Sequence, residues 1–348
     1  MSPGPRRKEV RPATRARRRL PSGATPERLV IDPAERRKAM LEVIADAKRR
    51  LTLSLFRCDD FQVLDALAAA LERGVEVRAL LTRRAKGGKK RLRKLWGALE
   101  EMGAIVSSYA DPVVKYHAKY LVADEGPAII ATLNPTQKCF SRTWDCLLVT
   151  HDSAVVRSLT AIFQADSTGR ALPDSGALSR RLIVGPERSR DQVRLLIQGA
   201  QHSIRIIDHK LSDPDVVALL RERRAEGLTV SVIGHQPMGA LAPHGKMMLI
   251  DETRALIGSM ALSTLSLDFR REVSVIVDEA DLVRRLNVAF QQLSVRVGPL
   301  TSELPGDSAA RPPAAGPRPE LDERHAQGSQ QRRRSRRPEV SAARKDVR

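Results

Sequence analysis

The sequence predicts an α/β fold built from two homologous α/β/α sandwich lobes. The 348-residue chain carries one motif twice, as His117-Ala-Lys119 and again as His244-Gly-Lys246, 127 positions apart. Stretches upstream of the two motifs also match, at a constant offset of 153 positions. In both halves, segments of helical period alternate with segments of strand period, which is typical of an α/β sheet covered by helices. A repeat of domain size predicts two lobes related by a pseudo-two-fold axis.

In the first half, the order is helix, strand, helix, strand. Apolar residues recur at helical spacing in the first segment and alternate in the second. Asp60 is placed as the N-cap of the next helix, and Gly74 as the residue that ends it. The expected elements are a helix over 37–50, a strand over 51–56, a helix over 63–73 and a strand over 75–81.

The second half repeats this order. Asp213 and Gly227 take the places of Asp60 and Gly74, each 153 positions further on. We expect a strand over 204–207, a helix over 216–225 and a strand over 228–233. The offset then falls from 153 to 127, so the first lobe carries 26 extra residues between Gly74 and His117.

These boundaries divide the chain into five parts. Both ends are rich in Pro, Arg, Gly and Ser and poor in apolar residues, so we expect them to be disordered. The first lobe contains the motif segment 117–134 and a basic insertion over 83–100, and the second contains the motif segment 244–261. The parts are a basic tail over 1–28, a lobe over 29–165, a linker over 166–181, a lobe over 182–299 and a basic tail over 300–348.

The net charge of +19 is concentrated in a few tracts. Residues 83–94 contain eight basic residues and no acid, and residues 92–99 are amphipathic at helical spacing. Part of this tract is therefore expected to form the polar face of a helix near the site. Such tracts serve solubility in general, or they attract phosphate polymers or anionic lipid surfaces.

Cysteine content and hydropathy indicate the compartment. The three cysteines form an odd set without metal-type spacing, which favours a reducing cytoplasm and no metal site. There is no apolar run of transmembrane length and no secretory signal, so we expect a cytoplasmic protein, at most peripheral at the membrane. The cysteines are Cys58, Cys139 and Cys146.

The repeated motif is suited to chemistry at a phosphate. In an extended strand, the His and Lys of each copy lie on one face. Two such faces, brought together at the lobe interface, would surround one phosphate with two imidazoles and two ammonium groups. Histidine serves as nucleophile or proton donor near neutral pH, and lysine stabilises the charge on the phosphoryl oxygens. This arrangement requires no metal or other cofactor.

Over residues 29–299, the chain resembles the phospholipase D superfamily, whose signature is HxKx4D followed six residues later by GSxN. The resemblance implies a phosphohistidine intermediate, with one histidine as nucleophile and the other as general acid. We assign His117 as nucleophile and His244 as acid, with Lys119 and Lys246 gripping the phosphate. The near-symmetry of the copies leaves the choice between the two histidines open. Both half-sites lie in one chain, so a monomer is expected.

Further residues take roles from the same resemblance. Asn134 matches the Asn of GSxN and is expected to bind the phosphate, as are Thr132 and Ser259. Ala261 stands where the signature has Asn, and Ala131-Thr132 replaces Gly-Ser, so each copy lacks a different part of the phosphate cradle.

Four acids complete the expected site. Asp145 and Glu272 match the downstream acid that orients the imidazole in this superfamily. Asp124 and Asp251 belong to the motif but are expected to hold the turn after the strand. The remaining histidines have no partner motif and are interpreted as ordinary residues, although His209 stands out because it ends a strand beside Lys210.

Three functions remain possible from the sequence. The first is a phospholipase D or cardiolipin synthase-like phosphatidyltransferase that acts on a phospholipid, which the architecture favours. The second is a nuclease or other nucleic-acid phosphodiesterase, which the basic tracts and the low aromatic content of 3% favour. The third is a catalytically degenerate member that binds phosphate without cleaving it.

Overall fold

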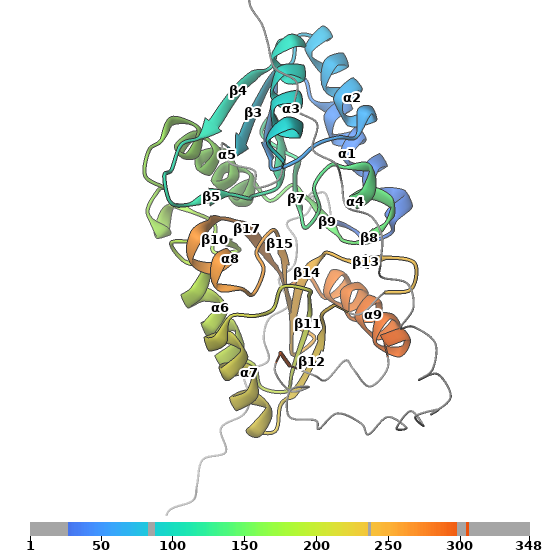
Figure 1. Cartoon of the computed structure of the whole chain (residues 1–348), viewed down its shortest axis with the longest axis vertical. Helices are drawn as coiled ribbons and strands as arrows, with labels where there is room; N and C mark the ends of the chain where they lie inside the picture. The colour runs from blue at the N-terminus through green and yellow to red at the C-terminus, as the bar shows by residue number, and fades with distance from the viewer. Residues whose placement is uncertain (1–26, 83–87, 236–237, 298–303, 306–348) are drawn as a thin grey trace, which may run out of the picture. The chain divides into compact units, whose positions relative to one another are not determined.

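The computed structural model describes residues 27–82, 88–235, 238–297 and 304–305 (Figure 1). The two tails predicted to be disordered lie almost entirely outside these residues, as does the segment 83–87 of the basic tract. Among the described helices, none combines the length and the apolar character needed to cross a membrane.

The first lobe is built on a seven-stranded sheet of order β1-β9-β7-β6-β2-β3-β4. The strands β2, β3 and β4 are parallel to one another, and the remaining pairings are antiparallel. The strands are β1 (Arg28–Val30), β2 (Arg50–Leu55), β3 (Glu76–Thr82), β4 (Ile105–Tyr109), β6 (Tyr120–Ala123), β7 (Ala128–Ala131) and β9 (Leu147–Thr150).

The second lobe repeats this sheet with six strands, in the order β10-β17-β15-β14-β11-β12. It has no counterpart of β4, so the additional strand and the helix before it account for the insertion seen in the sequence. The strands are β10 (Leu182–Val184), β11 (Ser203–Asp208), β12 (Thr229–Ile233), β14 (Lys246–Ile250), β15 (Arg254–Gly258) and β17 (Val273–Val277).

Helices cover both faces of each sheet and bury three apolar clusters. One cluster lies between the first sheet and α1, α2 and α3, and another lies between the second sheet and α6 and α7. The third cluster draws on both sheets together with α5 and α9. The helices are α1 (Pro33–Asp46), α2 (Phe61–Glu72), α3 (Lys89–Glu101), α4 (Gln137–Ser141), α5 (Ser153–Thr168), α6 (Ser189–Gln198), α7 (Pro214–Ala225), α8 (Thr264–Phe269), α9 (Ala280–Val297) and the short 3₁₀ helix η1 (Ser175–Ala177).

Two short parallel ladders join the lobes. Strand β8 (Thr143–Trp144) pairs with β13 (Ala242–Pro243), and β5 (Lys115–Tyr116) pairs with β16 (Arg270–Arg271). Each ladder therefore joins the segment before one histidine motif to the segment before the acid of the other copy.

The α/β class and the repeated helix–strand order are confirmed. Asp60 caps α2 by accepting a hydrogen bond from the Val63 amide (3.3 Å), and Asp213 caps α7 in the same way from Val216 (3.1 Å). Each cap is also held by an arginine of the preceding helix. Such paired caps stabilise the start of the helix and fix it against its neighbour.

Two local expectations are wrong. The helix expected over 37–50 ends at Asp46, and Arg50 already begins β2. The segment His117–Lys119 does not lie within a strand, because it falls between β5 and β6, and His244 precedes β14. The two histidines therefore lie just before β6 and β14. Each one follows a short strand that pairs with the other lobe and precedes a strand of its own lobe's sheet.

Candidate active site

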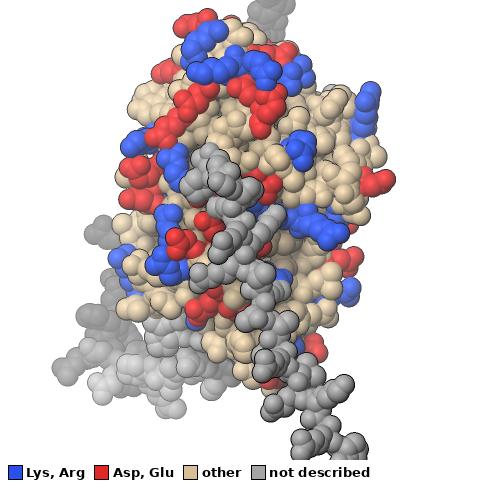
Figure 2. All heavy atoms as spheres, turned by 180° about the vertical axis from the view of Figure 1, so that it is seen from behind, with Lys and Arg blue, Asp and Glu red and all other residues tan. Residues whose placement is uncertain are grey.

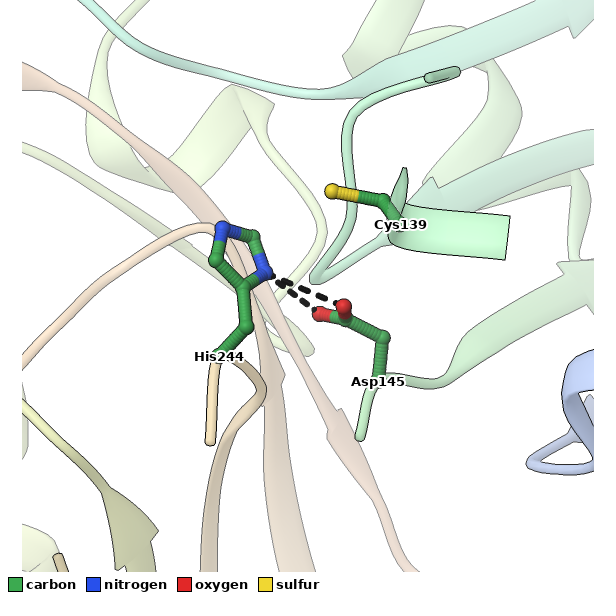
Figure 3. A group of neighbouring side chains, drawn as sticks. All are labelled: Cys139, Asp145 and His244. Carbon is green, nitrogen blue, oxygen red and sulfur yellow. Dashed lines mark hydrogen bonds and ion pairs between the residues drawn. The ribbon is translucent and has the colours of Figure 1, made fainter. Parts of the chain in front are cut away.

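The two histidines of the repeated motif are each held by the acid of the other copy. Nδ1 of His117 lies 2.9 Å from Oε1 of Glu272, and Nδ1 of His244 lies 2.9 Å from Oδ1 of Asp145 (Figure 3). The sequence predicted that these acids orient the imidazoles, but the repeat does not reveal that the pairs cross between lobes. In each pair, an Nδ1–H donated to the acid leaves Nε2 free to react.

The ladders between the lobes produce this crossed arrangement. The His117 amide donates to the carbonyl of Arg271 (2.9 Å), and the Gly245 amide donates to that of Trp144 (2.7 Å). A Cβ at Gly245 would lie 2.4 Å from the Trp144 ring, so only glycine fits at this position of the second motif. Each acid directly follows a residue that pairs with the opposite motif, which brings acid and histidine together.

Hydroxyl groups fix the two acids in turn. Thr132 Oγ1 donates to Asp145 Oδ1 (2.6 Å), and Thr143 Oγ1 donates to Asp145 Oδ2 (2.5 Å). Ser266 Oγ donates to Glu272 Oε1 (2.9 Å). Both Asp145 and Glu272 are fully buried, so these bonds offset part of their desolvation.

Thr132 and Ser259 were expected to contact the phosphate directly, but their hydroxyls lie elsewhere. Both side chains are fully buried, and the Ser259 hydroxyl bonds to the backbone of Val273 (3.2 Å to the carbonyl). Their hydrogen bonds support the acids and the strand behind them. The sequence could have indicated this, because both hydroxyls lie 13 residues before the acid of their own copy.

Cys139 lies beside the Asp145–His244 pair, and potential ligand atoms of the three residues lie within 4.8 Å of one another (Figure 3). The repeat places Cys139 at the position of Ser266, which supports the other acid. Lys246 contributes positive charge to this same pair. We therefore interpret the thiol as a neighbour of the acid and not as a ligand of a metal.

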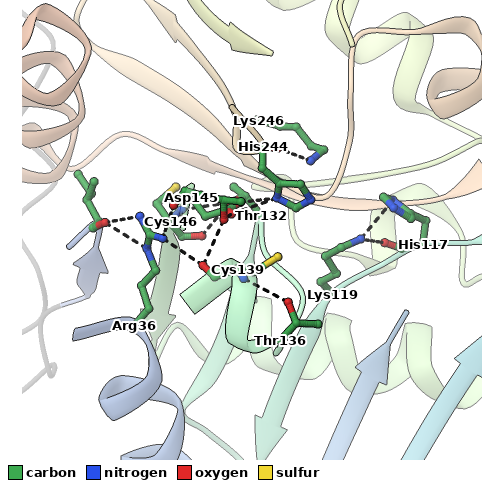
Figure 4. A network of polar contacts seen from close by, with 12 residues as sticks. Arg36, His117, Lys119, Thr132, Thr136, Cys139, Asp145, Cys146, His244 and Lys246 are labelled. Carbon is green, nitrogen blue, oxygen red and sulfur yellow. Dashed lines mark hydrogen bonds and ion pairs between the residues drawn. The ribbon is translucent and has the colours of Figure 1, made fainter. Parts of the chain in front are cut away.

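The two lysines lie against the histidines of their own motifs (Figure 4). Lys119 Nζ donates to the His117 carbonyl (2.6 Å), and Lys246 Nζ donates to the His244 carbonyl (2.7 Å). The side chains are 2% and 4% exposed. Burial lowers the pKa of Lys119 to about 7, against the opposing attraction of Glu272.

The two histidine–acid pairs differ in their electrostatics. Burial, reinforced by the nearby Lys119, holds the pKa of His117 well below its ordinary value. Burial also lowers the pKa of His244, although Asp145 opposes this. Burial raises the pKa of Glu272. Burial also acts to raise the pKa of Asp145, but the charge and hydrogen bond of His244, the charge of Lys246 and the hydrogen bond from Thr132 together outweigh it and lower that pKa. The Asp145 pair is thus the better suited to carry an imidazolium.

Asn134 is the second point of difference between the halves. Its side chain is 6% exposed, and Oδ1 is buried without a hydrogen-bond partner among the described residues. At the equivalent position, Ala261 has no polar side chain, and its backbone amide donates a hydrogen bond to the Ser266 hydroxyl (2.9 Å). An unpaired buried acceptor is costly, so Oδ1 of Asn134 is available to a hydrogen-bond donor of a ligand.

Asp124 and Asp251 lie at the far ends of their strands. The Asp124 carboxylate accepts hydrogen bonds from the backbone amides of residues 48–50, at 2.8–2.9 Å. Asp251 does the same for residues 201–203, at 2.7–2.9 Å. These bonds hold the turn between the preceding helix and β2 or β11.

Aromatic and cationic groups around the site escaped the sequence analysis. Phe56 contacts the His117 ring edge-on, with centroids 4.7 Å apart, and Lys119 Nζ lies 5.5 Å from the Phe56 centroid. Arg270 lies 4.0 Å from Glu272 and lowers the pKa of His117. The constant offset of the repeat was the signal that could have found Phe56, because it pairs with His209.

A family model described as "Cardiolipin synthase, PLD-like domain" matches residues 40–167 and 235–294. These segments make up more than half of the chain, which therefore belongs to this family of the phospholipase D superfamily. The resemblance stated from the motifs is confirmed. No curated protein matches the chain in a sequence comparison.

Solved structures share the fold. Polyphosphate kinase from Porphyromonas gingivalis matches with a TM-score of 0.63 and 17% identity, over 77% of this chain and 47% of that protein. Phosphatidylserine synthase from Haemophilus influenzae matches with a TM-score of 0.59 and 12% identity, over 77% of this chain and 86% of that protein. This chain thus corresponds to less than half the length of the kinase, and at these identities the likeness concerns the fold alone.

Proposed function

We propose that the protein cleaves or transfers a phosphodiester through a phosphohistidine at His117, without a metal. Nε2 of His117 attacks the phosphorus, and the bond to the leaving oxygen breaks as His244 gives that oxygen its Nε2 proton. The now neutral His244 then takes a proton from water or an alcohol, whose oxygen displaces His117 from phosphorus. Hydrolysis and transfer differ only in this acceptor.

The crossed histidine–acid pairs are the observation that carries this proposal. Each imidazole is fixed through Nδ1 by a buried acid from the other copy, at 2.9 Å, which leaves Nε2 as the ring nitrogen that reacts in this proposal. Lys119 and Lys246 supply positive charge beside them. Preorganised cations of this kind stabilise the charge that develops on the phosphoryl oxygens.

The low pKa of His117 supports its role as nucleophile, because the attacking imidazole must be neutral. The attraction between His244 and Asp145, which favours the charged form of both partners, supports His244 as the proton donor. The assignment made from the sequence is therefore retained.

For the substrate, we propose a phospholipid, with a phosphatidyl group transferred to water or an alcohol. Membership of a family described as cardiolipin synthase-like supports this choice. The shared fold with a phosphatidylserine synthase, which extends over 86% of that protein, adds to it.

A nucleic acid is the second candidate, and helix α3 is the observation that favours it. Strands β2 and β3 are parallel, so they end at the same edge of the sheet. At this edge, Phe56 follows β2 and contacts His117. Helix α3 begins shortly after β3, and all five basic residues of its first two turns are exposed. These cations would attract a phosphate polymer. On the face shown in Figure 2, by contrast, basic and acidic side chains are interspersed.

Substrate assays separate these candidates. Purified full-length protein with EDTA would be given fluorescent phosphatidylglycerol and phosphatidylcholine in vesicles, and separately single- and double-stranded DNA. We expect turnover of the lipid, retained in EDTA and abolished in His117→Ala. Turnover of DNA alone would replace the lipid by the second candidate. Binding of either substrate without turnover would identify a phosphate-binding protein, and loss of turnover in EDTA would contradict the metal-free mechanism.

A further inference from the structure

The residue packed against each catalytic histidine occupies the same place in the repeat. Phe56 follows β2, and His209 follows β11, 153 positions later. This is the offset that also relates Asp60 to Asp213. The duplication has therefore kept an aromatic ring at this position in both halves, but the rings differ in chemistry.

The two rings contact the two histidines in different ways. Phe56 meets His117 edge-on, with centroids 4.7 Å apart and planes at 63°. His209 is stacked on His244, with centroids 5.9 Å apart and planes at 23°. A stacked ring covers the face of the His244 imidazole and restricts the rotation of that side chain, in addition to the hydrogen bond that His244 Nδ1 donates to Asp145.

His209 also brings a polar atom to a place where Phe56 has none. Its Nδ1 is buried and has no hydrogen-bond partner among the described residues. A third ring, His235, lies edge-on to His209, with centroids 6.4 Å apart. Burial and the positive charge of Lys246 and Lys210 lower the pKa of His209 to about 4, so this ring is neutral near pH 7. A neutral imidazole can stack on an imidazolium without repelling it.

We propose that His209 is a positioning residue for His244, stacked on it to hold its ring and to adjust its solvation, while Phe56 packs against His117. The exchange of phenyl for imidazole makes the two half-sites chemically different. It leaves the proton-donating histidine beside a polar ring and the nucleophile beside an apolar one. This inference rests on the proposed function for the two roles, but the contact itself does not depend on turnover.

The solvation of His244 provides the test, because two substitutions should change it in opposite directions. His209→Ala removes the ring and admits water, so the pKa of His244 should rise toward its ordinary value. His209→Phe keeps a ring but removes its nitrogens, so the pKa should fall further, by about half a unit. His209→Asn restores a polar atom near the position of Nδ1 and should lie between the two. The charged groups that act on His244 (Asp145, Lys246 and Lys119) are unchanged in all three variants.

The measurement is an NMR titration of ¹⁵N-histidine side chains in the full-length protein, with Phe56→His as the mirror variant. We expect opposite shifts for the Ala and Phe variants at His244 and no shift of His244 in Phe56→His. The basic limb of the kcat/KM profile should move with the His244 titration. Unchanged titration of His244 in both variants, or equal shifts in the same direction, would overturn the inference. Absence of turnover in the wild type would refute the proposed function and leave the titration result standing.

Discussion

The two half-sites share a plan but differ in the residues that surround it. Both place a histidine at the start of a strand, a lysine two residues later and an acid from the opposite copy on Nδ1. Around this plan, one half contains Phe56 and the other His209, and one half contains Asn134 and the other Ala261. The duplication has preserved the histidine, lysine and acid of each half-site and altered the residues that surround them.

This difference supports the two roles that we propose for the histidines. A nucleophile must be neutral, and the His117 half combines burial with the positive charges of Lys119 and Arg270. A proton donor must be charged, and the attraction of Asp145 favours that form in the other half. Two identical half-sites would compete for each role, whereas unlike surroundings assign them.

The largest expected effect comes from breaking one crossed pair at a time. Asp145→Asn and Glu272→Gln should each lower kcat by on the order of 10²–10⁴-fold, because the imidazole loses its orienting acid and its correct tautomer. Steady-state kinetics of both variants checks this, with KM expected to change little. An effect of less than about threefold in either variant would mean that the acid serves folding alone.

Asn134 tests the altered cradle. Asn134→Ala should lower kcat by about 10²-fold, which corresponds to about 3 kcal/mol of transition-state stabilisation. The matched change in the other half, Ala261→Gly, should leave kcat within about threefold, because that position has no polar group to lose. Equal losses in both variants would show that the two cradles contribute alike.

The pH dependence of kcat/KM reports on the free half-sites. Activity requires neutral His117 and protonated His244, so it should fall below the pKa of the first and above that of the second. Both pKa values lie below the ordinary histidine value, and the ammonium of Lys119, with a pKa of about 7, is also lost as pH rises. We therefore expect an optimum on the acidic side of neutrality. An optimum above pH 8 would contradict the assigned roles.

The smallest effect on catalysis is expected from Asp124 and Asp251, the two acids that hold the turns before β2 and β11. Asp124→Ala and Asp251→Ala each remove a carboxylate that accepts three backbone hydrogen bonds. Each should lower the free energy of unfolding by about 3 kcal/mol, with the kcat of the folded protein unchanged. Denaturant unfolding and kinetics on the same samples check both parts. Loss of kcat without loss of stability would assign these acids to the site.

Much of this organisation could be predicted from the sequence, because the two copies of the repeat could be aligned with each other. Periodicity and caps gave the helix–strand order, since Asp60 and Asp213 begin helices through local hydrogen bonds. The crossing of Asp145 and Glu272 could not be predicted, because it depends on ladders between segments about 100 residues or more apart.

The motif also could not predict where the Thr132 hydroxyl lies. The GSxN signature assigns Thr132 to the phosphate, whereas in the fold its hydroxyl lies behind the site and bonds to Asp145. A motif records which residues are near a site but not which way their side chains point.

The most direct test of the two roles is to trap the intermediate with one histidine removed. His244→Ala and His117→Ala would each be mixed with a phosphodiester whose leaving group is a phenolate, which departs without a proton donor, then quenched in alkali and analysed by mass spectrometry. We predict a phosphoryl adduct on His117 in the His244→Ala variant and no adduct in the His117→Ala variant. An adduct on His244 in the His117→Ala variant, with none on His117, would contradict the division of roles.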